Sequence, residues 1–242
     1  MKLRIGYVSR NQTMPSINLT PSRSLAAAIA LAVLCGCGSS GGATKEEPHP
    51  ARSALAGMLG RPLLILPAQY LGTVTPVGQY ELSMSNRDLL PILDDELADV
   101  FRKRGVRKSW TFADEITAAA MRNEGMVQDP RDLSAESIRR IEVGDTPIPE
   151  PLGTQIRQLI ALQDGRYALI PVEIDIDTRP ARAGGTLHLV LVDSRTARVL
   201  WVDSVESPAP PDVPPNELLV GYGFRKLARA LATRFADMVV AQ

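Results

Sequence analysis

Residues Asp164–Ser207 read DGRYALIPVEIDIDTRPARAGGTLHLVLVDSRTARVLWVDSVES, and this stretch decides the fold because it predicts three consecutive strands. The first strand, Tyr167–Ile176, is apolar throughout its first half, which indicates burial on both faces, and then alternates aliphatic and acidic residues. The second strand, Thr186–Val192, follows a loop rich in Pro, Arg and Gly. After a polar turn, the third strand is predicted at Val199–Val205. Such short connections favour an antiparallel meander.

Several side chains of this block are predicted to have structural roles. Val199 and Trp201 are expected on one face of the third strand, because alternate residues share a face. Pro171 lacks a backbone donor and is expected where no ladder bond is needed. We interpret Asp193 and Trp201 as turn and packing residues, and His188 as a packed or half-exposed strand residue without a catalytic role.

The hairpin in this block resembles that of a known protein family. Its sequence, LHLVLVDSRTARVLW, has a strand ending in Val-Asp, a polar turn and a strand ending in Leu-Trp, after Gly165, Tyr167 and Leu169 in a Gly-x-Tyr-x-Leu order. In these features it is similar to the CsgG-like superfamily of bacterial envelope proteins. That superfamily includes the curli secretion channel, lipoproteins that activate peptidoglycan synthases, and the amino-terminal domain of the Tol translocation protein. The resemblance implies an αβ domain over roughly residues 59–240.

Composition sets limits on the partners of the chain. Four of its 27 basic residues and none of its 27 acidic residues lie in the first 36 positions, so the remainder is mildly acidic. This balance disfavours a nucleic-acid partner and provides no polybasic membrane patch. The two cysteines, Cys35 and Cys37, are also confined to the N-terminal region. The rest of the chain therefore has no disulfide, thiol nucleophile or cysteine metal site.

Residues 1–36 are predicted to be a signal peptide. Arg23 supplies the positive charge, and Leu25–Leu34 is an apolar segment too short for a permanent membrane-spanning helix. Residues 1–13 show no such pattern, whereas Met14 precedes a conventional signal sequence. We therefore put forward Met14 as a hypothetical true start.

The end of this segment predicts lipidation at Cys37. Leu34-Cys35-Gly36-Cys37 is similar to a bacterial lipoprotein box, with an aliphatic residue at −3 and a small residue at −1. Cys35 fits less well because Leu34 would precede it directly. The resemblance implies a bilayer partner reached through acylated Cys37. Because Gly38 rather than Asp follows, it also implies the inner leaflet of the outer membrane, facing the periplasm. An ordinary cleaved signal with two incidental cysteines is the alternative.

The remaining chain is predicted to be a linker and one folded domain. Residues 37–58 comprise Cys37 and a flexible linker rich in Gly, Ser and Pro. Residues 59–242 are predicted to form a single α/β (α+β) domain, with a mixed sheet of about five strands covered by amphipathic helices. Outside the meander we expect strands at 61–69 and 106–110, a stiff turn at 145–151, and helices at 88–104, 111–123, near 134, 153–163 and 217–240.

The charged residues of the helix at 88–104 allow two interpretations. Asp94, Asp95 and Glu96 are adjacent and cannot all face one way, so we interpret them as a solvated stretch. Arg102–Arg104 suit the negative end of the helix dipole. A partner-binding basic patch is the alternative interpretation of these three residues.

Three carboxylates, on Glu173, Asp175 and Asp177, are expected on one strand face. Successive residues on a face lie about 7 Å apart, which is close enough for a divalent ion to bind between paired carboxylates. We favour an exposed edge, or pairing with arginines such as Arg179 and Arg182.

The sequence contains no recognisable catalytic motif. It has no phosphate loop, Gly-x-Ser-x-Gly motif, metal-spaced His pair or cysteine nucleophile in the body. A hydrolase is therefore unsupported, and no cofactor is expected. We predict a non-enzymatic envelope lipoprotein that binds another protein or assembles with itself. The alternative is a subunit of an outer-membrane export channel, which the charged, helix-patterned segment Asp114–Pro149 disfavours.

Overall fold

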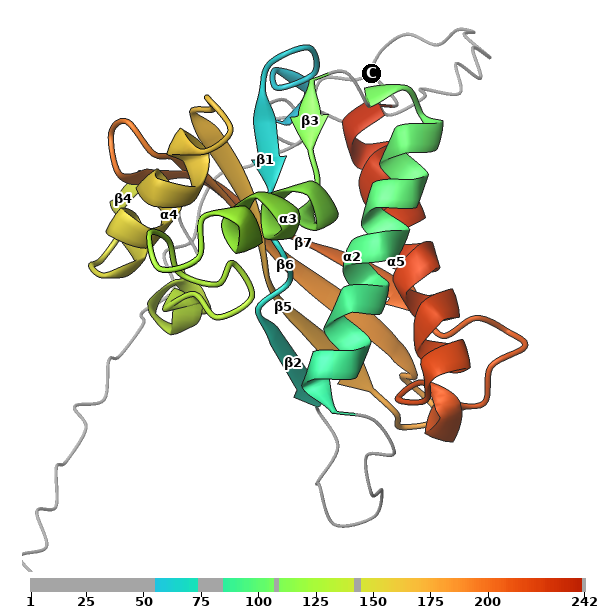
Figure 1. Ribbon diagram of the computed structural model, residues 1–242. Helices are drawn as coiled ribbons and strands as arrows, with labels where there is room; N and C mark the ends of the chain where they lie inside the picture. The colour runs from blue at the N-terminus through green and yellow to red at the C-terminus, as the bar shows by residue number, and fades with distance from the viewer. Residues whose placement is uncertain (1–54, 74–84, 107–108, 142–144, 241–242) are drawn as a thin grey trace, which may run out of the picture. The chain divides into compact units, whose positions relative to one another are not determined.

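The computed structural model describes residues 55–73, 85–106, 109–141 and 145–240. Within these residues a seven-stranded mixed sheet is packed against four α-helices and two short 3-10 helices (Figure 1). The predicted α/β fold class is therefore confirmed. The strands are β1 (Leu63–Ile65), β2 (Tyr70–Thr73), β3 (Trp110–Thr111), β4 (Thr146–Pro147), β5 (Tyr167–Asp177), β6 (Gly184–Asp193) and β7 (Arg198–Pro208). The helices are α2 (Asn86–Lys103), α3 (Ala113–Arg122), α4 (Leu152–Ala161) and α5 (Gly221–Val240), with 3-10 helices η2 (Ala135–Ile138) and η3 (Pro215–Glu217).

The strands follow the order β3-β1-β5-β6-β7-β4, and β2 pairs with β5 further along the same edge. The predicted antiparallel meander β5-β6-β7 is confirmed, with Tyr167 opposite Asp193 and Leu191 opposite Trp201. β1, β2 and β3 join it in parallel. The short strands β2 and β4 are additions to the five strands that the sequence predicted.

The pairing of β5 with its neighbours is irregular around Pro171. The strand predicted at 61–69 is limited to β1, and the chain pairs with β5 again as β2, which the sequence did not predict. Between the two strands, the Gln69 N–H donates to the carbonyl of Pro171 at 3.1 Å. On the other side of β5, the register with β6 shifts between Pro171 and Glu173. Pro171 thus lies where the ladder is irregular, as predicted.

A bulge in β7 corrects the predicted face of one residue. The register between β6 and β7 shifts between Leu191 and Val192, so that Leu191 pairs with Trp201 but Val192 pairs with Val199. An extra residue in one strand moves the following side chains to the other face. Val199 and Trp201 therefore lie in different hydrophobic clusters, although alternation predicted a shared face.

The first face of the sheet is covered by α2 and α5, which lie side by side (Figure 1). The apolar stripe predicted for α2 is buried here, and Phe101 packs against Phe235 of α5 with ring centroids 5.1 Å apart. This packing extends along most of the length of β5, β6 and β7. The residues that these strands place in the first hydrophobic cluster are Leu169, Ile174, Ile176, Leu187, Leu189, Leu191, Trp201 and Val205.

The second face is covered by α3, α4, η2 and the segments around them. The strand residues buried on this face are confined to one half of the long strands: Ala168, Ile170, Val172, Val190, Val192 and Val199. Ile156 and Ile160 of α4 and Ile138 of η2 pack against them, as their helical spacing predicted. Beyond Val172 the side chains on this face are polar.

The first turns of α2 and α3 are each closed by an acidic side chain. Ser85 precedes α2, and its hydroxyl donates to the Asp88 carboxylate at 2.7 Å. Pro91 lies inside α2, not in its first turn. Before α3, the N–H of Phe112 donates to the Glu115 carboxylate at 3.1 Å.

The final helix α5 begins at Gly221, four residues after the start that the sequence predicted at 217. A Cβ at Gly223 would lie 2.1 Å from the carbonyl oxygen of Glu217, so glycine permits the close approach of η3 to the helix. The stiff turn predicted at 145–151 contains β4, which pairs with the start of β7.

The outer edge of β7 is protected by side chains. β7 pairs with β4 only at its first two residues, and no other strand of the described residues lies beside it there. Along this edge the N–H of Ser204 donates to its neighbour Asp203 at 2.8 Å. The carbonyl of Glu206 accepts a hydrogen bond of 2.9 Å from Arg234 of α5. Backbone groups that are free of strand partners are thus partly satisfied within the chain.

Candidate functional site

The predicted lipidation site, Cys37, lies outside the described residues, as do the predicted signal peptide and most of the linker. These assignments remain predictions. Across residues 55–73, 85–106, 109–141 and 145–240, no helix has the length and apolar character needed to cross a bilayer.

The carboxylates of β5 point to the same face, as predicted, but pair with separate cations. Arg139, which follows η2, binds Glu173 through both carboxylate oxygens. Arg179 binds Asp177, with its Nε 2.9 Å from Oδ1. Among the described residues no group of three or more His, Cys, Asp or Glu is placed to hold a metal ion. The favoured interpretation, pairing with arginines such as Arg179, is therefore confirmed for Asp177.

His188 lies beside the remaining carboxylate of this face. Its Nε2 is 3.2 Å from Oδ2 of Asp175, and this hydrogen bond raises the pKa of His188 above its ordinary value. Ser204 is the cross-strand neighbour of His188, so an acid, an imidazole and a hydroxyl occupy adjacent strands. A catalytic triad also requires a hydrogen bond from the serine to the histidine. No hydrogen bond joins Ser204 to His188 in this part of the sheet, which the structure describes fully.

The predicted structural roles of Asp193 and Trp201 are confirmed. Asp193 is buried at the end of β6, where Arg166 binds its carboxylate with Nη2 2.6 Å from Oδ2. This hydrogen bond lowers the pKa of Asp193 below its ordinary value. Trp201 is 5% exposed in the first hydrophobic cluster.

The basic residues Arg102–Arg104 at the end of α2 have acidic partners within the chain. Arg102 Nη2 lies 2.8 Å from Asp114 Oδ1 at the start of α3. Arg104 Nη1 lies 2.5 Å from Asp237 Oδ1 of α5. This pairing agrees with a structural role at the helix end more than with a free basic patch.

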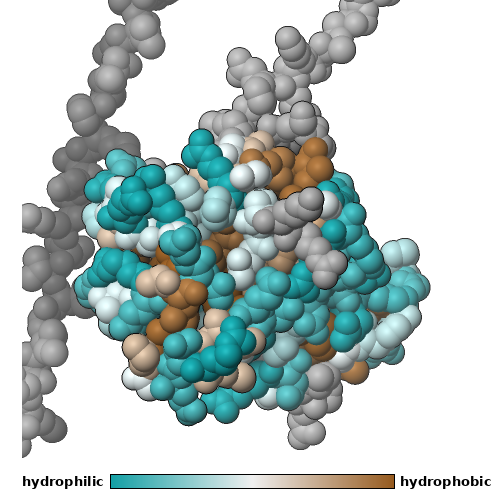
Figure 2. Space-filling view, turned by 45° about the horizontal axis from the view of Figure 1, so that its top comes forward, coloured by the Kyte–Doolittle hydropathy of each residue, from teal (hydrophilic) through white to brown (hydrophobic). Residues whose placement is uncertain are grey.

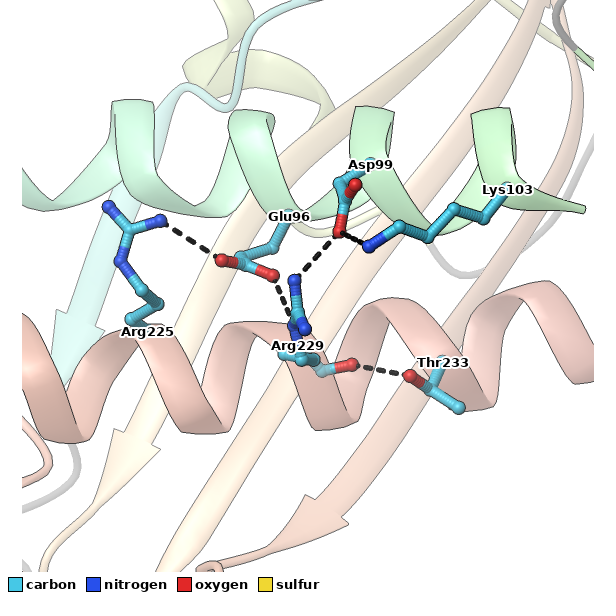
Figure 3. Close-up of polar contacts among 6 residues, drawn as sticks. All are labelled: Glu96, Asp99, Lys103, Arg225, Arg229 and Thr233. Atoms are coloured by element: carbon cyan, nitrogen blue, oxygen red, sulfur yellow. Dashed lines mark hydrogen bonds and ion pairs between the residues drawn. The ribbon is translucent and has the colours of Figure 1, made fainter.

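Glu96 corrects the interpretation of residues 94–96 as solvated. Its side chain is 4% exposed, and it accepts hydrogen bonds from Arg225 Nη1 at 3.0 Å and Arg229 Nε at 2.7 Å (Figure 3). Asp99, one turn later, binds Arg229 Nη2 and Lys103 Nζ, each at 2.7 Å. Because α5 lies against this side of α2, Glu96 is covered and requires the two guanidinium groups that α5 provides.

Asp94 is also buried, on another side of α2. Its Oδ1 accepts the N–H of Ala68 at 2.9 Å, and its Oδ2 lies 2.7 Å from Arg131 Nη1. Burial raises the pKa of Asp94 to about 6, against the opposing effects of these two partners. Only Asp95 is exposed, as predicted. The prediction failed for the other two residues because α2 is covered on more than its apolar stripe.

Gln69 provides a second tie to the segment that contains Arg131. Its Nε2 donates to the carbonyl of Pro130 at 2.9 Å, and its Oε1 accepts the N–H of Leu133 at 3.1 Å. Buried polar groups paired in this way fix a segment that has little regular structure. The segment after α3 is therefore held against the second face of the sheet at defined points.

A surface near the end of α3 was not recognised from the sequence. Met121 is 72% exposed and Met126 is 73% exposed. Met121 lines a depression of about 380 Å³, and Met126 lies in the turn after α3. We call these two side chains together with the depression the methionine surface. The depression is lined by Thr117, Ala120, Met121, Glu124, Val127, Gln128, Asp129 and Pro130. Met121 lies off the buried face of α3 set by Ile116 and Ala120, a signal that was available in the helical spacing.

Comparisons with known proteins give distant similarities only. No family model matches, and no curated protein matches. The C-terminal domain of LpoB from Salmonella enterica is 12% identical, with 65% of this chain and 95% of that chain covered and a TM-score of 0.36. LpoB from Escherichia coli is 11% identical, with 85% and 93% covered and a TM-score of 0.35. A lipoprotein from Neisseria meningitidis is 15% identical, with 70% and 97% covered and a TM-score of 0.32. Because each TM-score is below 0.5, no property of these proteins is assigned to this chain.

Proposed function

We propose that this chain is a bacterial cell-envelope lipoprotein whose αβ domain is a non-enzymatic module that binds another envelope protein or a second copy of itself. The observation that carries the proposal is the sequence Leu34-Cys35-Gly36-Cys37 at the end of a short apolar segment. It provides a thiol for a diacylglyceryl anchor, and a polar linker separates this thiol from the folded domain.

The anchor defines where the domain operates. Each buried methylene contributes about 0.8 kcal/mol, and two or more acyl chains make attachment stable. The part of the predicted linker that precedes the first described residue, Leu55, comprises residues 38–54. At roughly 3.5 Å per extended residue it reaches at most about 60 Å, and a flexible chain of this length spans about 25 Å on average. The domain would therefore remain close to the membrane surface, on the periplasmic side of the outer membrane.

The charged side chains that an enzymatic alternative would use are paired within the domain. The strongest catalytic candidates, His188 with Asp175 and the carboxylates of β5, lie on the sheet face and have partners within the chain. An export channel would need the segment Asp114–Pro149 to form long amphipathic hairpins. In its described parts this segment contains most of α3, together with η2 and β4. Neither observation favours the enzyme or the channel interpretation.

Metabolic labelling with radioactive palmitate tests the anchor. The parent chain should incorporate the label and sediment with membranes. Cys37→Ala should lose both properties, whereas Cys35→Ala, the matched control two residues away, should retain them. Absence of label from the parent chain, or loss of label in Cys35→Ala alone, would overturn the assignment of Cys37.

A further inference from the structure

We infer that the methionine surface is a docking site for a segment of a partner protein that presents an aliphatic side chain beside a lysine or arginine. This inference rests on the proposed function, because it names the place and the chemistry of the protein contact. Three properties of the surface carry it: exposed apolar side chains, a preformed depression, and acidic residues without cationic partners.

The apolar character of the surface comes from Met121 and Met126. They are the two most exposed large hydrophobic side chains of the described residues, at 72% and 73%, and the next is Tyr222 of α5 at 64%. Methionine is flexible and polarizable, and it is common at surfaces that adapt to a partner. Figure 2 shows a largely hydrophilic surface on which hydrophobic areas are limited. Met121 at the depression, with Met126 exposed in the turn that follows its helix, therefore marks a candidate contact area.

The depression lined by Met121 is already formed in the free domain. The turn after α3 is closed by the N–H of Met126, which donates to the carbonyl of Asn123 at 3.0 Å. The Asn123 side chain in turn donates to the carbonyl of Ala119 at 2.9 Å. Further along, Arg131 is tied to buried Asp94. A partner would therefore meet a shaped surface, which reduces the entropy lost on binding.

The charge of the surface selects the partner. Glu124 and Asp129 line the depression, and its lining contains no lysine or arginine. Neither carboxylate forms an ion pair with another described residue, in contrast to Glu96, Asp114 and Glu173. A cationic side chain on the partner would complement them, and charge complementarity mainly provides specificity and a faster encounter. Anionic lipid headgroups would be repelled, so the surface fits a protein better than the bilayer.

Photocrosslinking in living cells tests the inference on the full lipidated chain. Met121→p-benzoylphenylalanine places the probe on the methionine surface, and Tyr222→p-benzoylphenylalanine is the control at a comparably exposed position of α5. We expect a light-dependent protein adduct from position 121 only. Sequencing of the adduct should identify a partner peptide that carries an aliphatic residue next to a lysine or arginine.

Charge reversal provides the second arm. Glu124→Lys with Asp129→Lys should reduce the adduct yield at position 121 at least fivefold, because it removes the proposed attraction to the cation. The matched control, Asp95→Lys with Glu217→Lys, reverses two exposed carboxylates elsewhere and should leave the yield unchanged. Thermal melting of each variant checks that the domain remains folded.

Four outcomes would overturn the inference: an unchanged yield after charge reversal, an adduct to lipid, an adduct to a second copy of this chain, or a partner peptide of acidic or wholly polar character. Protein adducts from position 222 and none from position 121 would refute this surface but leave the proposed function intact. Absence of protein adducts from both positions would refute the docking site and count against the binding function as well.

Discussion

The two faces of the sheet are closed in different ways. On the first face, α2 and α5 run side by side over the full length of the meander, and ion pairs such as Glu96 with Arg229 join the two helices (Figures 1 and 3). On the second face, shorter elements cover one half of the strands, and buried polar groups such as Asp94 and Gln69 hold irregular segments in place. The difference indicates that the first face provides most of the stability of the domain. On the second face, the half of the strands beyond Val172 carries polar side chains, and the methionine surface lies near the end of α3.

Truncation of Phe235 should break the first face most severely. The side chain is fully buried between α5 and α2, against Phe101. Phe235→Ala removes this contact and leaves a cavity, so we expect a loss of about 3–5 kcal/mol in the free energy of unfolding, measured by urea denaturation. Val240→Ala, at a partly exposed position of the same helix, should cost less than about 1 kcal/mol. Equal effects of the two variants would contradict the assigned core.

Removal of one cation between α2 and α5 should have the next largest effect. Arg229→Ala leaves the buried Glu96 carboxylate with Arg225 as its only guanidinium partner, at an expected cost of about 3 kcal/mol. Glu96→Gln, the control, removes the buried charge instead and should cost about 1 kcal/mol, because the remaining arginines are more than half exposed. Urea denaturation measures both values. A larger loss for Glu96→Gln than for Arg229→Ala would contradict the view that the buried Glu96 charge requires both arginines.

The tie at Asp94 should appear as a pH dependence. Burial raises its pKa in the folded state to about 6, above an unfolded value of about 3.9. The folded state therefore binds the proton more tightly, and stability is lost as the pH rises from about 4 through 6. Asp94→Asn removes this titration. The free energy of unfolding of the variant minus that of the parent should increase by about 2–3 kcal/mol between roughly pH 4 and pH 7. A difference that does not change with pH would refute a raised pKa of Asp94 in the folded domain.

Thr117 offers the smallest and most specific comparison. Its hydroxyl, on α3 over the second face, is buried and has no hydrogen-bond partner among the described residues. Thr117→Val should therefore be neutral or stabilise the domain by up to about 1 kcal/mol. Thr233→Val on α5 is the matched control, because the Thr233 hydroxyl donates to the carbonyl of Arg229 at 2.8 Å (Figure 3). That variant should lose about 0.5–1 kcal/mol in thermal or urea denaturation. A loss at Thr117 equal to that at Thr233 would indicate an unrecognised partner.

Periodicity predicted the elements that are long enough to repeat their pattern. The alternation of β5 and β6 and the helical stripe of α2 contain several residues each, so the buried faces were correctly assigned. β2 and β4, by contrast, contain four and two residues and form only through pairing with distant strands. The exchange of faces between Val199 and Trp201 depends on a bulge, which one strand does not specify by itself.

The site residues also divide into those that local sequence could assign and those that depend on distant parts of the chain. Turn chemistry was sufficient to assign Asp193. The lipidation prediction at Cys37 depends on the resemblance of Leu34-Cys35-Gly36-Cys37 to a lipoprotein box, and it stays a prediction. The burial of Asp94 and Glu96 depends on partners from distant parts of the chain, Arg131 and Arg229, and could not be predicted from their own helix. The methionine surface depends on how the segment after α3 folds back, although the off-face position of Met121 was visible.

If Cys37 carries the proposed anchor, the protected edge of β7 has a consequence for copies that share one membrane. Molecules tethered to a leaflet diffuse in two dimensions and collide far more often than they would in bulk solution. An unguarded strand edge would invite sheet extension from one molecule to its neighbour. Asp203 and Arg234 occupy backbone positions that such an extension would need. Under the proposed anchoring, these contacts would oppose sheet extension between neighbouring copies at this edge.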